Sequence, residues 1–174
     1  MRILGIDPGT RITGYGLIEV RGSRSIPVAH GKIANSASLP LSKCFRNIYR
    51  QLRVVIDSHK PQAVAIENVF YCKNVNSAIK LGEARGVAIL AAAESDLEIF
   101  EYMPRKVKQA VVGQGGADKI QVLKMVKMLL GLKEDIESVD ASDALAVALC
   151  HAHTIKGSLM IAQSGLKQKA SNRL

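Results

Sequence analysis

Four acidic residues occupy positions that distinguish them from ordinary surface charges. Asp7 and Glu67 each end a short apolar run, while Asp140 and Asp143 are three residues apart and so share one face of a helix. Carboxylate oxygens are hard ligands that favour Mg²⁺ or Mn²⁺. A pair of such ions clamps the attacking and leaving oxygens of a phosphodiester during in-line displacement. If the four acids meet, we expect metal-dependent phosphodiester chemistry.

Each of these acids also has an ordinary structural interpretation. Asp7 opens the sequence Asp-Pro-Gly, which forms turns by itself. Asp140 and Asp143 could stabilise a helix N-terminus, by ~0.3–1 kcal/mol each, and Glu67 could pair with a lysine. Taken together these interpretations weaken, because two carboxylates ~4 Å apart repel by ~4 kcal/mol at an effective dielectric constant of about 20. A fold keeps such a cluster only if cations neutralise it or its members share protons.

The elements that must position these acids follow from the hydrophobic pattern. Apolar or alternating runs predict five strands, at residues 2–7, 12–20, 25–34, 63–67 and 97–102. Helical periodicity predicts five helices, at residues 39–58, 74–95, 104–112, 117–130 and 139–153.

This order of elements predicts an α/β fold. Three antiparallel strands followed by strand–helix units form one mixed five-stranded sheet with helices on its faces. The first and fourth strands can be neighbours in such a sheet. Their C-terminal ends would then present Asp7 and Glu67 side by side.

Composition indicates one nucleic-acid-binding domain. The chain has 174 residues, enough for one domain with a substantial core, and 24 basic against 15 acidic residues give a net charge of +9. Such a charge favours a polyanionic partner, nucleic acid first and anionic membrane second. An acidic centre inside a basic protein is the charge pattern expected of a metal-dependent nuclease.

Other compositional features exclude several classes of protein. The longest stretch without Asp, Glu, Lys or Arg, residues 144–155, is shorter than the ~18 residues that a transmembrane helix needs. No signal peptide is visible, since Asp7 interrupts the first apolar run. The three cysteines are odd in number and far apart, which predicts reduced thiols in a cytoplasmic protein. The four histidines have no ligand spacing with them, and we assign them no chemistry.

Basic and aromatic residues gather in two segments. Between Tyr102 and Lys133 one acid faces seven basic residues: Arg105, Lys106, Lys108, Lys119, Lys124, Lys127 and Lys133. A solvated face and a phosphate-contacting face both fit this run. In the loop after Glu67, Phe70 and Tyr71 stand close to Lys73. They could stack on an unpaired base, worth ~1–3 kcal/mol per base, or anchor the chain to a neighbouring subunit.

Several of these segments resemble a known family. Residues 5–16, GIDPGTRITGYG, closely resemble the opening of the RuvC-type crossover (Holliday) junction endodeoxyribonucleases. Later blocks of that family resemble the segments at residues 66–74, 80–86, 107–113 and 140–146. The resemblance spans about residues 2–155, in order and at consistent spacing, and it is more specific than any single motif.

The resemblance implies a ribonuclease H-like fold and a homodimer that nicks two strands of a four-way DNA junction symmetrically, in homologous recombination and DNA repair. Asp7, Glu67, Asp140 and Asp143 would hold the divalent ions, with two Mg²⁺ per subunit and Mn²⁺ as a substitute. Lys108 and Lys119 fall where the family has functional basic residues close to the cleaved phosphate, and Lys108 would take part in catalysis. The family works with a branch-migration complex of RuvA and RuvB.

The resemblance and the basic segments together predict the residues that contact DNA. They are Phe70, Tyr71, Lys73, Lys80, Arg85, Arg105, Lys106, Lys108, Lys119 and Lys124. The small residues of the helix at 74–95 make it the candidate dimer interface, because a C₂ dimer supplies two active sites to a nearly two-fold symmetric junction. We predict a nuclease domain at residues 1–155 and a basic, flexible tail at residues 156–174.

Three other functions share some of these features. Residues 6–10 also resemble the first phosphate loop of actin-like and sugar-kinase ATPases, which need a duplicated domain that 174 residues cannot supply. Small resolvase-like nucleases of RNA processing share the first Asp-x-Gly, without Phe70 and the 80–86 block as a set. A non-catalytic DNA-binding module would have the same charge, and Mg²⁺-dependent cutting would exclude it.

Overall fold

A five-stranded mixed sheet forms the centre of the protein. In the computed structural model, which describes residues 1–68 and 74–171, the strand order is β3-β2-β1-β4-β5. β1, β2 and β3 are antiparallel, whereas β4 is parallel to β1 and β5 is parallel to β4. The strands are β1 (Arg2–Asp7), β2 (Ile12–Arg21), β3 (Arg24–Ala34), β4 (Ala63–Glu67) and β5 (Glu98–Tyr102). The sequence predicted the bounds of all five to within one residue.

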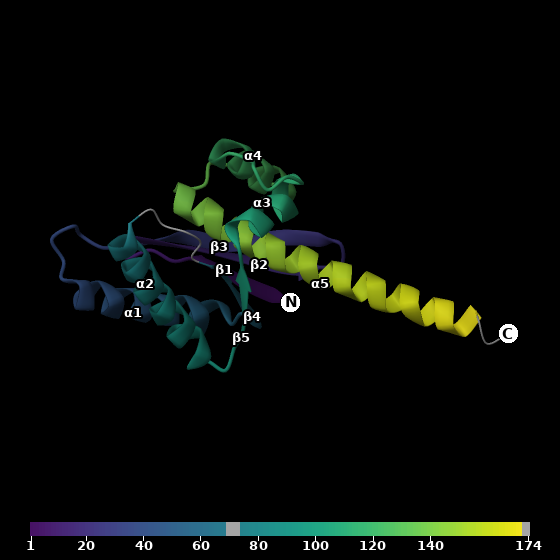
Figure 1. Cartoon of the computed structure of the whole chain (residues 1–174), viewed down its shortest axis with the longest axis horizontal. Helices are drawn as coiled ribbons and strands as arrows, with labels where there is room; N and C mark the ends of the chain where they lie inside the picture. The colour runs from purple at the N-terminus through teal and green to yellow at the C-terminus, as the bar shows by residue number, and fades with distance from the viewer. Residues whose placement is uncertain (69–73, 172–174) are drawn as a thin grey trace.

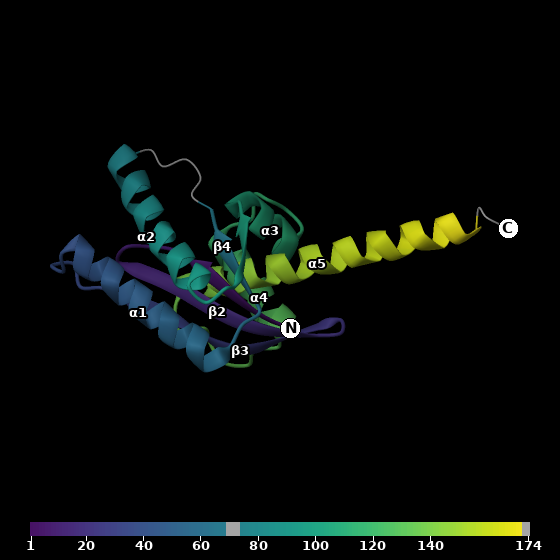
Figure 2. The same cartoon turned by 90° about the horizontal axis from the view of Figure 1, so that it is seen from below.

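Helices cover both faces of this sheet (Figure 1, Figure 2). One face packs against α1 (Leu41–His59) and α2 (Val75–Ala93). The other packs against α3 (Pro104–Val112), α4 (Lys119–Leu130) and the first part of α5 (Val139–Ser171). β1 and β4 lie in the middle of the sheet and are buried on both sides, which explains why each is a continuous apolar run.

Two clusters of buried side chains make up the core, one on each face of the sheet. Leu4 of β1 and Ile48 of α1 belong to one cluster, whereas Ile3 of β1 and Leu145 of α5 belong to the other. Neighbouring residues of one strand point to opposite faces, so β1 contributes to both clusters. The domain is therefore the α/β sandwich that the order of elements predicted.

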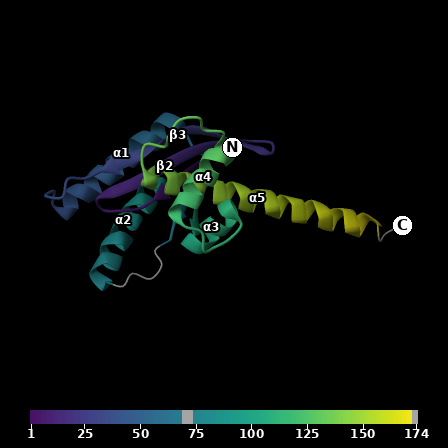
Figure 3. The same cartoon turned by 90° about the horizontal axis from the view of Figure 1, so that it is seen from above.

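α5 is longer than the sequence indicated. We expected this helix to end near residue 153 and a loosely ordered tail to begin at 156, but the backbone is helical to Ser171 and projects away from the sheet (Figure 1, Figure 3). The physical reason is that residues 154–171 contain no proline, and most of them are compatible with a helix. The flexibility of this segment stays a prediction. Among the described residues, no helix is long and apolar enough to cross a membrane.

Candidate active site

Asp7 and Glu67 lie at the same edge of the sheet. β1 and β4 are parallel, and Ile6 pairs with Ile66, so the two acids follow directly at the ends of the two strands. Both side chains are partly buried, and both line one pocket. The expectation that the first and fourth strands are neighbours is confirmed.

The start of α5 brings the other two acids to this edge. The hydroxyl of Ser138 accepts a hydrogen bond from the backbone N–H of Ala141 (3.1 Å), which fixes the first turn of the helix. The helix backbone then lies directly on the sheet. A Cβ added to Gly14 would lie 2.0 Å from the carbonyl oxygen of Asp140, and one added to Gly5 would lie 2.0 Å from that of Ala144. Only glycine at these positions allows so close an approach.

The acids face a pocket of about 280 Å³. Asp7 from β1, Glu67 from β4 and Asp143 from α5 contribute carboxylates to its wall, and Lys108 and Lys119 contribute ammonium groups. The complete lining is Asp7, Glu67, Pro104, Val107, Lys108, Lys119, Val122, Asp143 and Ala146. Asp140 lies one turn of helix before Asp143, and its negative charge contributes to the raised pKa values of Asp7 and Asp143. The structure therefore brings three of the four predicted acids into one cavity.

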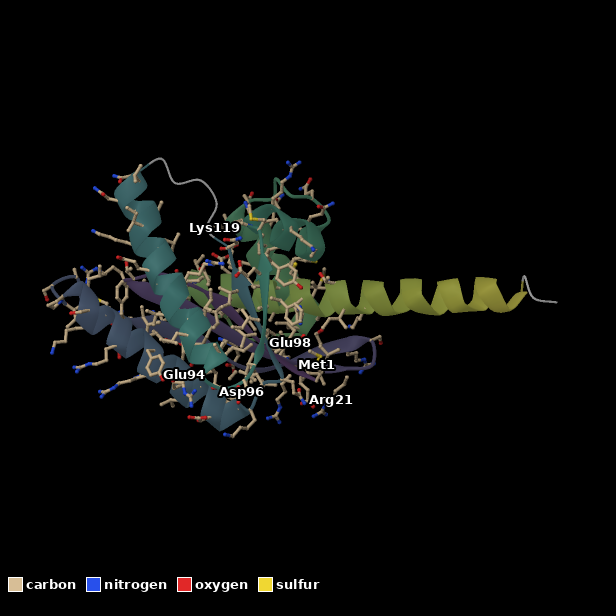
Figure 4. All side chains as sticks on the ribbon, turned by 60° about the horizontal axis from the view of Figure 1, so that its bottom comes forward. Met1, Arg21, Glu94, Asp96, Glu98 and Lys119 are labelled. Carbon is tan, nitrogen blue, oxygen red and sulfur yellow. The ribbon has the colours of Figure 1, made fainter. Side chains whose placement is uncertain are left out.

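Lys119 lies at the mouth of this pocket because a capping box fixes the start of α4. The side chain of Asp118 accepts a hydrogen bond from the backbone N–H of Gln121 (2.8 Å), and the side chain of Gln121 accepts one from the backbone N–H of Asp118 (3.0 Å). The Nζ of Lys119 is 3.4 Å from Oδ2 of Asp143. Figure 4 labels Lys119 in this region, and its side chain is mostly exposed. Lys119 thus contacts the acidic cluster on one side and the solvent on the other.

The carboxyl groups of the cluster hold protons unusually tightly. Burial raises the pKa of Asp7 to about 8, and the charges of Glu67, Asp143 and Asp140 contribute to the increase. Burial also raises the pKa of Glu67 to about 7, with a further contribution from Asp143 and with opposition from a hydrogen bond to Asp7 and from Lys119 and Lys108. The pKa of Asp143 is raised mainly by burial, against the lowering effect of Lys119. Near neutral pH the cluster shares protons, and a bound cation would displace them.

The donor atoms in the pocket fit a hard divalent cation. All three acids offer oxygen, the ligand type that Mg²⁺ and Mn²⁺ prefer. Across residues 1–68 and 74–171, however, no three acidic, histidine or cysteine side chains already surround one common ion position. The pocket therefore has suitable ligands in an open arrangement, and an ion would have to draw them together.

The basic residues predicted to contact DNA from the 102–133 segment lie on α3 and α4. Arg105 and Lys106 are exposed on α3, and the Nζ of Lys106 is 5.2 Å from the centre of the Tyr102 ring. Lys108 is on the same helix and reaches the acidic pocket, while Lys124 is exposed on α4. Of these four residues, Lys108 therefore lies at the acids, whereas the other three lie on the exposed surface of α3 and α4.

The predicted DNA-contacting residues of the second segment are separated by the fold. Lys80 is exposed on α2 and lines a shallow pocket with Arg11 of the β1–β2 turn. Arg85 instead forms an ion pair with Glu101 of β5, and its side chain is only 21% exposed. Its assignment to DNA stays a prediction. Phe70, Tyr71 and Lys73 lie outside the described residues.

One feature near the site was missed by sequence reasoning. The hydroxyl of Tyr102 and Nδ1 of His151 are 2.7 Å apart and buried, and the His151 ring lies 4.1 Å from that of Phe100. Tyr102 pairs with Glu67 across β4 and β5, while His151 is on the helix that carries Asp143. No spacing in the sequence marks this pair. The repeat Gly14-x-Gly16 on a strand was, in contrast, an available signal for the close approach of α5.

A larger cavity, of about 430 Å³, lies far along α5 from the acids. The β2–β3 turn, the end of α4 and residues near Lys156 enclose it. Its lining contains Arg24, His153 and Lys156 and no acid. His153 is the one side chain of this lining that commonly binds metals, and no carboxylate of the lining lies beside it, so the smaller acidic pocket is the candidate active site.

Comparison with known proteins agrees with this assignment. The sequence profile of the family described as Crossover junction endodeoxyribonuclease RuvC matches residues 3–151. The protein of that name from Syntrophotalea carbinolica is 56% identical over 153 residues, which cover 88% of this chain and 94% of that protein. The one from Geotalea uraniireducens is 53% identical over 154 residues, covering 88% and 90%.

Solved structures show the same fold. RuvC of Thermus thermophilus is 34% identical and superposes with a TM-score of 0.83, covering 91% of this chain and 97% of that one. The same protein in complex with a Holliday junction substrate gives a TM-score of 0.86, covering 91% and 96%. The sheet order and the helices on both faces are thus those of a ribonuclease H-like resolvase. The chain belongs to the crossover junction endodeoxyribonuclease RuvC family.

Proposed function

We propose that this protein is a metal-dependent endonuclease that resolves four-way (Holliday) DNA junctions by two symmetric nicks, in homologous recombination and DNA repair. One observation carries the proposal: carboxylates from β1, β4 and α5 meet in one pocket whose other charged members are lysines. The Thermus thermophilus relative, whose fold this chain shares, has a solved complex with a Holliday junction.

In this proposal the acidic residues of the pocket bind metal ions and its basic residues bind the phosphate. Asp7, Glu67 and Asp143 of the pocket hold the cations together with Asp140 of the preceding turn, with two Mg²⁺ per subunit and Mn²⁺ as a substitute. When bound, such ions activate a water and stabilise both oxygens of an in-line displacement. Lys108 and Lys119 reach the same cavity from α3 and α4 and attract the scissile phosphate.

The surface of α2 supports a homodimer. Val75, Ile79 and Leu90 are exposed apolar side chains on this helix, at 72%, 54% and 51%. Their spacing places all three on one face of the helix, and exposed apolar residues gathered on one face are typical of an interface. Two copies related by a two-fold axis would present two active sites to one junction. RuvA and RuvB as partners, inferred from the family, and a cytoplasmic location, inferred from the number and spacing of the cysteines, complete the proposal.

The test is cleavage of an end-labelled synthetic four-way junction beside a linear duplex of the same sequence. Each is incubated with Mg²⁺ and with EDTA. We expect paired nicks at symmetric positions in the junction alone, and only with the metal. Binding of the junction without nicks would favour a non-catalytic binding module, and equal cutting of the duplex would favour a general nuclease. Either result would overturn the proposal.

A further inference from the structure

We propose that the outer face of α1 binds the phosphate backbone of a second junction arm, away from the acidic pocket. The face is defined by Lys43, Arg46 and Arg50 and is named here the α1 track. None of the three is among the residues that sequence or family resemblance assigned to DNA. The inference rests on the proposed function, because it assumes a branched substrate.

The spacing of the α1 track suits a nucleic-acid backbone. Its members are three and four residues apart, so they form one stripe along the helix, and all three are exposed. Seven residues of helix rise about 10 Å, close to three base-pair steps of ~3.4 Å. The opposite face of α1, which contains Ile48 and Leu52, is buried in the core. The exposed side of α1 therefore presents the three basic residues, and further along the helix it presents Val54 and Asp57, which pairs with Lys60.

No acid neutralises the α1 track. Among the residues that the structure describes, Lys43, Arg46 and Arg50 form no ion pair. A groove of about 240 Å³ runs beside them, and its remaining lining residues are Leu39 and Asn47. One apolar side chain is too little for a docked hydrophobic peptide, whereas three unpaired cations are what a phosphate backbone requires. The regular spacing of the three cations along one stripe, close to that of base-pair steps, favours DNA over an acidic protein.

Hydrogen bonds connect the start of α1 to the turn that follows Asp7. The side-chain amide of Asn47 donates to Oδ1 of Asn35 (2.9 Å), and that of Asn35 donates to the carbonyl oxygen of Thr10 (2.9 Å). Arg11 of the same turn donates to the carbonyl oxygen of Leu39 (3.1 Å), just before α1. This chain of hydrogen bonds holds the start of the track at a fixed position relative to the catalytic edge.

The two basic surfaces lie on opposite faces of the sheet. α1 covers one face and the α3–α4 pair covers the other (Figure 1, Figure 2). One straight duplex that follows α3 and α4 would leave the α1 track empty. A branched substrate places arms on both sides of the catalytic edge. A junction can therefore contact the α1 track while it is bound at the acidic pocket, whereas a linear duplex cannot.

The experiment compares a triple variant, Lys43→Gln/Arg46→Gln/Arg50→Gln, with the wild type in binding to junctions in EDTA at several salt concentrations. One junction has long arms and the other has arms shortened below one helical turn, about 10 base pairs. With long arms, we expect the slope of log affinity against log salt to fall by about three for each subunit whose α1 track binds an arm, since each lost phosphate contact removes ~0.9. With short arms we expect the two proteins to agree.

The control variant removes the same charge elsewhere. Arg21→Gln/Arg24→Gln/Lys156→Gln alters the β2–β3 turn and the α5 lysine that contacts it, and Figure 4 shows Arg21 far from Lys119. It should keep the wild-type slope on both junctions. Lys43→Arg/Arg46→Lys/Arg50→Lys keeps the charge and should also bind like the wild type. All substituted side chains on α1 are exposed, so the triple variant should unfold at the wild-type temperature.

Two results would overturn the inference: a triple variant that keeps the wild-type salt slope on long arms, or one that loses the same slope on short arms. Failure of the proposed junction resolution would be detected by a different measurement, the cleavage assay on the wild type, as cutting of linear duplex or as no cutting at all. The α1 track is instead tested by the difference in binding between the triple variant and the wild type.

Discussion

A Cβ at Gly14 would lie 2.0 Å from the carbonyl oxygen of Asp140. The backbone of β2 and the first turn of α5 are therefore in direct contact, with no side chain between them. Gly14 pairs with Asp7 across β1 and β2, so this contact is next to the acidic pocket. The distance of Asp143 from Asp7 and Glu67 is set by the absence of a side chain on β2.

Replacing Gly14 by alanine should move α5 away from the sheet. The new methyl group would overlap backbone atoms, which cannot rotate away, and overpacking of this kind costs about 1–3 kcal/mol. We expect a lower unfolding temperature and slower junction cleavage. The control is Gly157→Ala on α5, where nothing lies within 4 Å of the added Cβ. It should be neutral or stabilising, since alanine favours a helix by about 1 kcal/mol. Equal unfolding temperatures for Gly14→Ala and the wild type would contradict this account.

Asp7→Asn should separate binding from cleavage. The change removes a metal ligand and a negative charge, so junction affinity should stay the same or increase. Cleavage should fall about a thousandfold or more, because a bound metal contributes several kcal/mol and each ~1.4 kcal/mol is a factor of ten. Single-turnover cleavage and a binding titration in EDTA measure the two effects. Asp57→Asn, an exposed acid on α1, is the control. Loss of junction binding by Asp7→Asn would argue against its role as a ligand.

The metal-free protein should become less stable as pH rises. The pKa of Asp7 is about 8 in the folded state against 3.8 in the reference state, and that of Glu67 is about 7 against 4.5. Between these values the folded protein holds protons that the unfolded chain releases, so the free energy of unfolding decreases with increasing pH. In EDTA, the unfolding temperature should decline from about pH 5 to about pH 8. Mg²⁺ at pH 8 should restore it by binding only the folded state.

Asp7→Asn tests the origin of this decline. Asparagine does not titrate, so the variant should show a flatter dependence of unfolding temperature on pH, with the remainder due to Glu67. Asp57→Asn should keep the wild-type decline. An unfolding temperature of the wild type that is constant or rises over this pH range would show that the carboxyl groups are fully ionised in the folded protein.

Lys119→Met should shift the pH dependence of cleavage. The Lys119 ammonium lowers the pKa values of Asp143, Glu67 and Asp7, so its loss makes each acid harder to ionise. The acidic limb of the pH–rate profile should move to higher pH, with a lower rate at neutral pH. Lys124→Met removes an equal charge from the same helix outside the pocket, and it should weaken junction binding without moving the profile. Identical profiles for the two variants would assign Lys119 to DNA binding alone.

The fold was largely predictable because its signals are local. Asp7-Pro8-Gly9 marks a turn, Pro104 begins α3, and Gly113 ends it with a positive φ of 87°. The alternation of apolar residues gave each strand, and the order of elements gave the mixed sheet. The end of α5 was not predictable in the same way. The segment beyond Lys156 contains no proline, which favours a helix, but it contains Gly157 and Gly165, which oppose one, so its sequence favours neither state clearly.

The candidate site was predictable in composition and less so in arrangement. The sequence identified Asp7, Glu67, Asp140 and Asp143 as exceptional, and three of them line one pocket. The resemblance gave Lys108, which reaches the acids, a catalytic role, but nothing in the sequence showed that Arg85 pairs with Glu101. Both are basic residues in segments that resemble the family. Which partner a long side chain reaches depends on neighbouring elements that its own segment does not encode.

The sequence by itself determined the elements, the family and the kinds of group available for chemistry, because each of these is written in residue types and in their spacing along the chain. Only the tertiary structure decided how those groups meet. The parallel pairing of β1 with β4, the seating of α5 on Gly14 and the placement of Lys119 beside Asp143 are contacts between residues far apart in sequence. Burial at that meeting point raises the pKa values of the acids, and burial is a property of the packed chain.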